Sequence, residues 1–318
     1  MALTLAQAAL LSQNQLQRGV QEIFVQESSV LDRIPLLTIQ GNAYAYNKEA
    51  SLPGVAFRSV NEAYTESTGT VVQATESLVI LGGDADVDRF IVQTRGDLND
   101  QRAIQTRLKV KSASYKFQDA FFNGDITVDP KGFDGLKKRL IGAQVLDAGT
   151  NGIPVLGNGG TDAHAFYDAL DQLVAAVPGL TPENGAIYAN RALQAKIRSA
   201  GRRLGGVEVV REDTTGKRVL QWNGVPVLDP GQNLAGAEIL GLNETQGSAT
   251  TASSVYAVKF GSDETEQGVT GLTNGGVQVD DLGQLQEKPA YRTRIEFYCG
   301  LATFGGKAAA RLRGVLNA

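Results

Sequence analysis

The sequence predicts an α+β fold, and three observations support this class. Apolar and polar residues alternate on both sides of a Pro-Gly turn signal in residues 41–72, which is typical of strands. Residues 97–122 carry apolar side chains at helical spacing over a length well beyond that of an average helix. The other predicted helices and strands do not follow the regular alternation of a parallel sheet.

The composition indicates a folded protein with many turns. Hydrophobic residues make up 42% of the 318 residues, which is enough for a core. This length suggests about two domains. Glycine is frequent, at 37 residues, so we expect many irregular connections. The 30 basic and 34 acidic residues nearly balance, which argues against a strongly basic surface for coating nucleic acid.

The cysteine content and the N-terminus indicate the cellular setting. The single Cys299 excludes an intramolecular disulfide and a cysteine-based metal cage, so we expect a reducing cytoplasm. The N-terminal residues lack the basic start and the uninterrupted apolar core of a secretory signal. No window approaches the roughly 18 apolar residues of a membrane span, so none is expected.

The N-terminal region is predicted to be helical. Residues 4–7 (TLAQ) form a capping box at the start of an alanine- and leucine-rich helix that runs to about Arg18. A short helical stretch at residues 20–26 follows Gly19, and Pro35 ends any helix before it.

A two-stranded ribbon is predicted next. Residues 43–46 and 55–60 alternate apolar and polar side chains, and residues 51–54 are the predicted turn between them. After the ribbon, residues 77–81 are predicted as a buried strand.

The segment 97–122 is predicted as one long helix. Asp97 can cap its start, and Asn123-Gly124 is expected to end it. Its apolar residues fall on two adjacent stripes, namely Ile104, Leu108, Tyr115 and Phe122, and then Val110, Ala113, Phe117 and Phe121.

The C-terminal half mixes short helices and strands. Helices are predicted at residues 162–177 and 189–204, and a strand at 185–190 leads into the second helix. Further strands are predicted at residues 207–210 and 218–222 around a turn at 213–216, and at 224–229, 254–260 and 291–298. Residues 306–317 are a basic tail.

Two glycine-rich segments imitate nucleotide-binding loops but fail on inspection. Residues 153–160 precede a helix, but Asp162 holds the place of the third glycine, where its carboxylate would repel a pyrophosphate. Gly305-Gly306-Lys307 resembles the end of a phosphate loop, but Leu301 replaces the first glycine and Ala308 replaces the hydroxyl that binds magnesium.

The titratable residues do not assemble a catalytic site in the sequence. His164 is the only histidine, and it could act as a base for Cys299, but no supporting motif accompanies it. The pairs Asp84/Asp86 and Asp280/Asp281 are interpreted as solvated residues of polar loops, and Trp222 as core. We therefore expect no catalytic residues, no metal site and no cofactor.

The order of elements resembles one family. Residues 186–193 (AIYANRAL), 220–227 (LQWNGVPV) and 294–300 (RIEFYCG) follow a short arm, an extended loop and a long helix. This order resembles a tailed-bacteriophage major capsid protein, whose shell fold is shared with encapsulins and the herpesvirus capsid floor. The resemblance implies four parts: an N-terminal arm (1–40), an extended β-hairpin loop (41–76), a peripheral domain with a long spine helix (77–150 and 285–318) and an axial domain (151–284).

The resemblance also implies a function. A structural coat protein is expected to assemble through pentamers and hexamers into an icosahedral shell that encloses the double-stranded DNA of a tailed phage. It would be located in the virion capsid and assembled in the host cytoplasm. The alternatives are an encapsulin-like compartment shell and, more remotely, an enzyme with an unrecognised site.

The resemblance sets the expected partners as well. These are other copies of the chain, a separate scaffolding protein, a portal, cement proteins, and DNA held without sequence preference, but no membrane. The separate scaffold is expected because only about 40 residues, starting at Met1, precede the extended loop. Some relatives join the loop to a neighbour by a lysine–asparagine bond. Lys48 and Asn317 would be candidates here, but we expect no such bond, because Lys48-Glu49 is interpreted as a solvated pair.

The extended loop is the predicted site of contact between subunits. One hairpin cannot bury enough apolar surface to be stable alone, so the loop is expected to lie against another copy. The predicted contact residues are Tyr44, Tyr46, Lys48, Glu49, Phe57, Arg58, Glu62, Tyr64 and Glu66.

Overall fold

A computed structural model describes residues 28–95, 101–157, 160–204, 210–212 and 218–318. The helices predicted within residues 4–26, the cap at Asp97 and the turn at 213–216 lie outside this part of the chain. The described residues mix helices and strands, so the α+β class is confirmed.

The helices and strands lie close to the predicted ones. The helices are α3 (Arg89–Arg95), α4 (Gln101–Asn123), α5 (Leu136–Arg139), α6 (Gly160–Ala175) and α7 (Arg191–Leu204), with a 3-10 turn η1 (Gly142–Gln144). The strands are β1 (Leu36–Thr38), β2 (Ala43–Ser51), β3 (Thr70–Ser77), β4 (Val79–Asp88), β5 (Val145–Asp147), β6 (Ile153–Pro154), β7 (Gly185–Tyr188), β8 (Val210–Glu212), β9 (Arg218–Trp222), β10 (Val225–Leu228), β11 (Glu244–Gln246), β12 (Ala249–Lys259), β13 (Val269–Gln284), β14 (Ala290–Thr303) and β15 (Ala309–Leu316).

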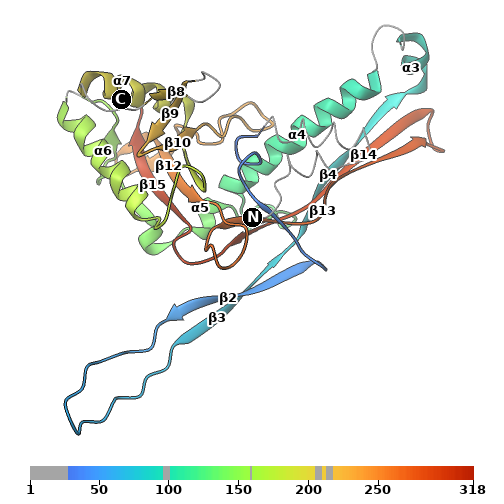
Figure 1. Cartoon of the computed structure of the whole chain (residues 1–318). Coiled ribbons are helices and arrows are strands. Elements are labelled where there is room, and N and C mark those ends of the chain that lie inside the picture. Colours follow the sequence, from blue (N-terminus) through green and yellow to red (C-terminus); the bar gives the residue numbers. More distant parts are fainter. Residues whose placement is uncertain (1–27, 96–100, 158–159, 205–209, 213–217) are drawn as a thin grey trace.

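A four-stranded sheet carries the long helix α4 (Figure 1). Its strand order is β1-β13-β14-β4, with β14 antiparallel to both of its neighbours and β1 parallel to β13. Phe117 of α4 packs on Phe297 of β14, with ring centroids 5.8 Å apart. The predicted spine helix therefore lies along a sheet, and its aromatic side chains hold the two together.

A second, larger sheet carries α6 and α7. Its main strand order is β5-β15-β12-β7-β10-β9-β8. The strand β15 lies inside this sheet, antiparallel to β12 on one side and parallel to β5 and β6 on the other. The basic tail predicted from the sequence is thus largely a buried strand, because its alanine, leucine and valine residues alternate with the arginines.

Successive side chains of a strand point to opposite faces of the sheet. In the central strands β7 and β12 of the second sheet, consecutive residues are buried, so both faces are covered there. Tyr188 of β7 and Tyr256 of β12 pack on Phe122 of α4, with ring centroids 5.2 and 5.3 Å apart. The neighbouring Ile187 and Ala257 point the other way, into the core shared with α6 and α7. The core around Phe122, Tyr188 and Tyr256 also contains Val30, Leu31 and Ile34. The described end of the N-terminal arm is therefore packed into the body.

The two predicted stripes of α4 are covered unequally. Val110, Phe117 and Phe121 of the second stripe are buried. The first stripe is buried at its C-terminal end, at Phe122, but Ile104 and Leu108 nearer the start of the helix are exposed. The helix ends at Asn123 as predicted. A Cβ at Gly124 would lie only 2.3 Å from the carbonyl oxygen of Phe133, so only glycine fits this approach of the two segments.

Two strands pair differently from the expected division of the chain. The strand β13 falls within residues 151–284 but pairs with β14 in the four-stranded sheet. The strand β15 falls within 285–318 but completes the second sheet. The strand predicted at 77–81 begins at Val79 and is half-buried rather than buried, because Ile80 faces outward.

Removing the ring of Phe122 is expected to destabilise the body. Phe122 is fully buried between the two sheets, so Phe122→Ala should lower the free energy of unfolding by roughly 3–5 kcal/mol. Urea-induced unfolding of isolated subunits measures this change. Phe57→Ala, at a fully exposed phenylalanine, is the matched control and should change it by less than about 0.5 kcal/mol. Equal losses from both variants would contradict this account of the core.

Candidate functional site

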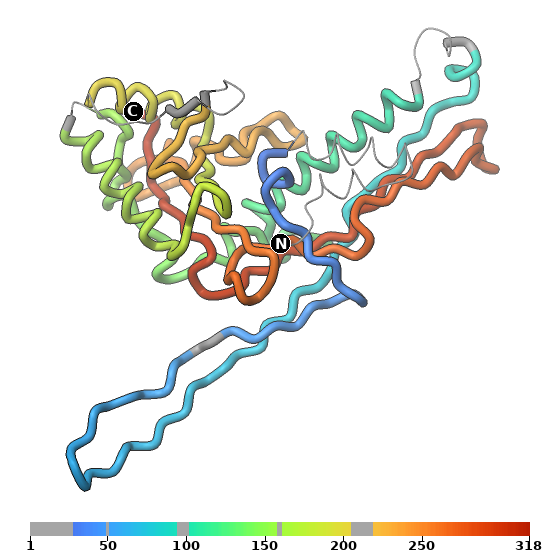
Figure 2. Tube along the Cα trace, in the orientation of Figure 1, coloured from blue at the N-terminus to red at the C-terminus, as the bar shows by residue number. Residues whose placement is uncertain are grey.

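The ribbon, residues 43–77, projects from the body (Figure 2). We call strands β2 and β3 its root and residues 52–69 its tip. The strands pair antiparallel, with Ala43 opposite Ser77 and Lys48 opposite Val72. The tip continues beyond the paired strands, and no other segment lies beside it in Figure 2.

The predicted turn at residues 51–54 is wrong. The strand β2 pairs with β3 rather than with residues 55–60, which belong to no strand. Pro53 has no amide hydrogen to donate, so the ladder stops at Ser51. The chain reverses instead at residues 59–62, where the amide of Glu62 donates to the carbonyl oxygen of Ser59 at 3.2 Å.

The tip is held by its own polar contacts. The Glu62 carboxylate accepts from the Ser59 amide at 2.9 Å, and Arg58 donates to the Glu62 carbonyl oxygen at 3.1 Å. The Arg58 guanidinium also lies 5.1 Å from the centre of the Tyr64 ring. These contacts give the tip a defined shape without any contribution from the body.

The apolar side chains of the tip are left in water. Val55 is 95% exposed and Val60 is 90% exposed, and Phe57 between them is also fully exposed. Leu52 and Tyr64 are largely exposed as well. Burying such side chains gains about 25 cal/mol per Å² of apolar surface, so a projecting cluster of this kind is typical of a surface that another molecule covers.

The root, in contrast, is packed on the body of the same chain. Tyr46 is 3% exposed, and its ring lies edge-on to Phe304 with centroids 4.9 Å apart. Its hydroxyl donates to the carbonyl oxygen of Thr303 at 3.3 Å. Burial is the main cause that raises the pKa of Tyr46. Tyr46 therefore anchors the ribbon and is not free to contact a neighbour.

Two polar contacts reinforce this anchor. The hydroxyl of Tyr44 donates to Glu264 at 2.7 Å, and this bond is the main cause that raises the pKa of Tyr44 to about 12. Glu76 of β3 forms a two-pronged ion pair with Arg139, in which Nη2 of Arg139 donates to Oε2 of Glu76 at 2.8 Å. A charge pair of this geometry fixes direction as well as distance.

The nine predicted contact residues thus divide into two groups. Phe57, Arg58, Glu62, Tyr64 and Glu66 lie together on the exposed tip. Tyr44, Tyr46 and Lys48 lie at the root, and of these the assignment of Tyr46 to a neighbour is wrong because its own chain buries it. The side chain of Glu49 lies outside the described residues. The half-buried Lys48 lies 5.3 Å from the Tyr46 ring centre, so it is not the solvated residue expected.

Further exposed apolar surface was not predicted. One group lies where α3 meets α4 and comprises Phe90, Ile91, Ile104 and Leu108. Another borders a groove between β4 and the loop after α4, with Ile80 and Val128 exposed. The apolar periodicity of α4 marked Ile104 and Leu108, but periodicity does not show which part of a helix is left uncovered.

The structure does not bring the candidate catalytic residues together. Cys299 is buried in β14, and burial raises the pKa of its thiol to about 12. His164 lies exposed on α6, which packs on the other sheet. A buried, protonated thiol has no nucleophilic character, so this pair supplies no base and no nucleophile.

The acidic pairs lie on strands rather than in loops, and of the two pairs Asp280 and Asp281 are exposed to solvent as expected. Asp84 and Asp86 lie on β4, opposite Arg294 and Arg292 of β14, and both arginines bind in two-pronged fashion at 2.7–3.0 Å. Asp281 on β13 binds Arg102 of α4 at 2.6 Å. These contacts tie the strands and the helix together across the first sheet.

The two glycine-rich segments have structural explanations. The carboxylate of Asp162 lies against Gly157, where a Cβ would come within 2.0 Å of it, so the close approach of these two residues requires the glycine. Gly305-Gly306-Lys307 forms a turn that leads into strand β15, not into a helix. Among the described residues, no group of three His, Cys, Asp or Glu side chains is placed to hold a metal ion. No helix in the described ranges is both long and apolar enough to cross a membrane.

A family model matches the N-terminal half of the chain. The model of the major capsid protein GP7 aligns with residues 12–164, which include the ribbon and α4. This match confirms the resemblance inferred from the sequence. No curated protein sequence matches the chain.

Solved structures share the fold over nearly the whole chain. The SrpI encapsulin complex of Synechococcus elongatus is 17% identical, with a TM-score of 0.63, and the match covers 91% of this chain and 87% of that one. The capsid of the native GTA particle is 14% identical, with a TM-score of 0.63 and coverages of 91% and 90%. The satellite phage P4 procapsid, which includes a size determination (Sid) protein, is 12% identical, with a TM-score of 0.53 and coverages of 94% and 99%. The fold is therefore that of phage capsids and encapsulins.

Loosening the root is expected to free the ribbon without unfolding the body. Tyr46→Ala removes the ring that packs on Phe304 and should speed hydrogen exchange at the amides of β2 and β3 by at least tenfold, because local opening no longer breaks that contact. Hydrogen exchange with mass spectrometry measures this. Val72→Ala, at an exposed position of the same ribbon, is the control and should leave the rates unchanged. Unchanged rates in Tyr46→Ala would contradict the anchor.

Acid is expected to weaken the first sheet through its aspartates. The hydrogen bond from Arg294 is the main cause that lowers the pKa of Asp84, and those from Arg292 and Lys288 lower the pKa of Asp86. Groups whose pKa is lowered in the folded state stabilise it above the ordinary Asp pKa of about 4, and this stability is lost as the pH falls through the folded values. The free energy of unfolding should thus decrease below about pH 4.

Substitution of one aspartate separates this effect from general acid denaturation. Asp84→Asn should give a shallower fall in the unfolding free energy between about pH 5 and pH 2, measured with urea. Asp168→Asn, on the exposed side of α6 with no ion pair to any described residue, is the control. An equal slope in Asp84→Asn and the unsubstituted protein would show that the Asp84–Arg294 ion pair does not contribute to the pH dependence of folding.

Proposed function

We infer that this chain is a major coat protein that assembles into the shell of a tailed bacteriophage. Its fold is that of phage capsids and encapsulins, and the family model that matches it describes a major capsid protein. The role is structural, and self-assembly into a closed shell places the protein in the virion capsid.

One observation of this chain carries the proposal: the ribbon exposes its apolar tip and fixes its root. A tip with Val55, Phe57 and Val60 in water lowers its free energy by packing on another surface. The anchor at Tyr46 determines the direction in which the tip is presented. We propose that each ribbon lies on a neighbouring copy, so that the apolar tip is covered only on assembly.

Contacts of this kind add up in a closed shell. A subunit that lends its ribbon to one neighbour and receives a ribbon from another must break both contacts to leave. The charges at Arg58, Glu62 and Glu66 can set the register of the tip on its neighbour. We propose pentamers and hexamers as the units formed in this way.

We also propose that the two sheets correspond to two domains of the shell fold. The four-stranded sheet and α4 would form the peripheral domain, and the larger sheet with α6 and α7 would form the axial domain. On this basis β13 belongs with the peripheral domain and β15 with the axial domain, in agreement with their pairing.

The partners follow from this role. We propose a separate scaffolding protein, a portal, cement proteins and assembly in the host cytoplasm; the P4 procapsid structure, with its size determination protein, gives a precedent for an accessory assembly factor. The DNA inside would be held without sequence preference, because 30 basic residues against 34 acidic ones give no strong drive from counterion release. We propose no enzymatic activity and no covalent bond at Lys48.

An encapsulin-like compartment is the second candidate, because the SrpI encapsulin has the same TM-score as the GTA capsid. The contents of purified particles distinguish the two. Phage DNA inside them supports the coat protein, and a cargo protein without DNA supports the compartment.

Polar substitution of the tip is expected to stop assembly. Val55→Ser, Phe57→Ser and Val60→Ser together remove the apolar cluster but leave the anchored root and both cores intact. The triple variant should keep the circular dichroism spectrum and melting temperature of the subunit while shells, counted by sedimentation and electron microscopy, fall at least tenfold. Leu234→Ser, at an exposed leucine of the body, is the control and should assemble normally.

Two outcomes would refute the role given to the tip. Shells formed in normal yield by the triple variant would mean that the tip is not a contact. Loss of the subunit fold would mean that the tip packs within its own chain, which is contrary to its exposure.

A further inference from the structure

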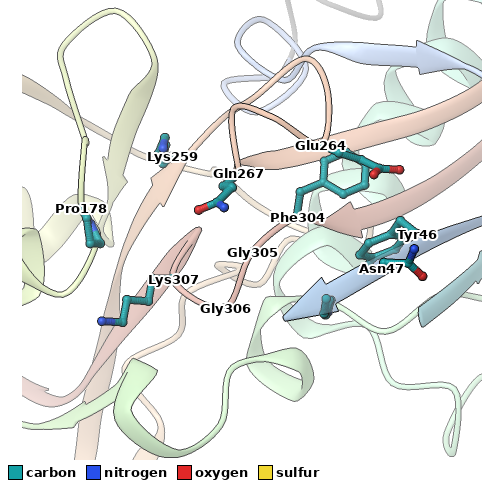
Figure 3. A pocket seen from close by; sticks show the side chains of 11 residues that line it. Tyr46, Asn47, Pro178, Lys259, Glu264, Gln267, Phe304, Gly305, Gly306 and Lys307 are labelled. Atoms are coloured by element: carbon teal, nitrogen blue, oxygen red, sulfur yellow. The ribbon is translucent and has the colours of Figure 1, made fainter. Parts of the chain in front are cut away.

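A cavity of about 490 Å³ lies where the root of the ribbon meets the body (Figure 3). Its lining comes from four parts of the chain that are distant in sequence. Tyr46 and Lys48 come from β2, Pro178 comes from the loop after α6, and Lys259 and Gln267 come from the end of β12 and the loop that follows it. The turn at residues 304–307 closes the remaining side.

The charges that line this cavity are unbalanced. Lys48, Lys259 and Lys307 border it, whereas Glu264 is the only carboxylate among the lining residues. Glu264 already accepts the hydrogen bond from Tyr44 at 2.7 Å. Within the described part of the chain, none of the three lysines forms an ion pair.

One acidic group outside the lining, Glu76, is already paired with an arginine. Glu76 lies near Lys48, but its carboxylate is bound by both arms of Arg139. Burial is the main cause that lowers the pKa of Lys48, and the charge of Arg139 lowers it further while Glu76 raises it, so an additional negative charge beside Lys48 would stabilise its ammonium group. An anion in the cavity would supply that charge.

The turn at residues 304–307 adds accessible backbone to the lysines. Gly305 has φ +76°, which favours glycine, and a Cβ at Gly306 would meet no atom within 4 Å. The backbone of Gly306 therefore borders open space beside Lys307 (Figure 3). Exposed amides in glycine turns bind anions, and lysine is a frequent ligand of phosphate groups.

We propose that this cavity binds a phosphate oxyanion with several negative charges. Several linked phosphate groups have enough oxygens to accept from Lys259, Lys307 and the glycine turn at different sides of the cavity while they neutralise Lys48. The source is either a free oligophosphate or the phosphodiester backbone of a nucleic acid. This site goes beyond the coat function and does not depend on it.

A ligand at this place would also hold the ribbon. Lys48 belongs to the ribbon, whereas Lys259 and Lys307 belong to the second sheet and the turn beside it. One anion bound by all three would join the ribbon root to the body and restrict the angle at which the tip is presented.

Isothermal titration calorimetry of isolated subunits at low salt tests the site. Tripolyphosphate probes the free source and a ten-nucleotide single-stranded DNA probes the nucleic-acid source, with citrate as a carboxylate comparison. We expect one site per chain for at least one phosphate probe. Lys259→Gln and Lys307→Gln should each weaken binding roughly tenfold. Lys196→Gln on α7, which does not line the cavity, should have no effect.

A second readout examines the link to the ribbon. The bound probe should slow hydrogen exchange at the amides of β2 and β3, and Lys48→Gln should remove this effect. Lys307 lies on an exposed turn, so Lys307→Gln keeps the test valid if Lys259→Gln does not fold.

Each outcome decides the matter. Binding of tripolyphosphate or of DNA that depends on Lys259 and Lys307 supports the site and identifies the source. No binding of either phosphate probe, binding unaffected by the lysine substitutions, or binding of citrate alone would overturn the proposal. Shell formation is scored separately, so failure here leaves the coat function untouched.

Discussion

The packing of Tyr46 on Phe304 is the contact on which the direction of the ribbon, and so the presentation of its tip, depends. It joins the root of the ribbon to the turn between β14 and β15, and these two strands belong to different sheets. The same small core therefore joins the ribbon to the sheet under α4, and Phe304 stands at the start of the turn that leads to β15 in the other sheet. Without it, the 18-residue tip would be supported by two strands held to the body mainly through polar contacts, and an isolated two-stranded ribbon is marginal in water.

The subunit divides its apolar surface between two uses. Side chains that face the two sheets are buried within the chain and make it stable alone, as with Phe122 between Tyr188 and Tyr256. Side chains on the tip and near α3 are left exposed, although they are of the same chemical kind. Fold and assembly thus draw on the same hydrophobic driving force but at separate places, so a change at one need not disturb the other.

The sequence predicted where helices and strands lie better than it predicted which segments they pair with or pack on. The helices at 162–177 and 189–204 were predicted within a few residues because their apolar periodicity is strong. The strand containing Asp84 and Asp86 was mistaken for a loop, since Gly82-Gly83-Asp84 has no strand propensity of its own; arginines from β14, about 210 positions later, stabilise it. The tip was predicted as a contact surface, and its apolar side chains are exposed in the structure. The burial of Tyr46 could not be predicted, because alternation shows which residues share a face and not what covers that face.

The position of β15 bears on when the subunit becomes complete during its synthesis. This strand is translated after every other described strand, yet it lies inside the second sheet and supplies partners to β5, β6 and β12. A nascent chain that lacks it has two unpaired edges in the middle of its larger sheet, so that sheet cannot close while residues 309–316 are still in the ribosome. The ribbon, by contrast, is translated early. A subunit therefore acquires the means to reach a neighbour long before it has a finished surface to offer one, and the emergence of β15 from the ribosome becomes the event that completes that surface.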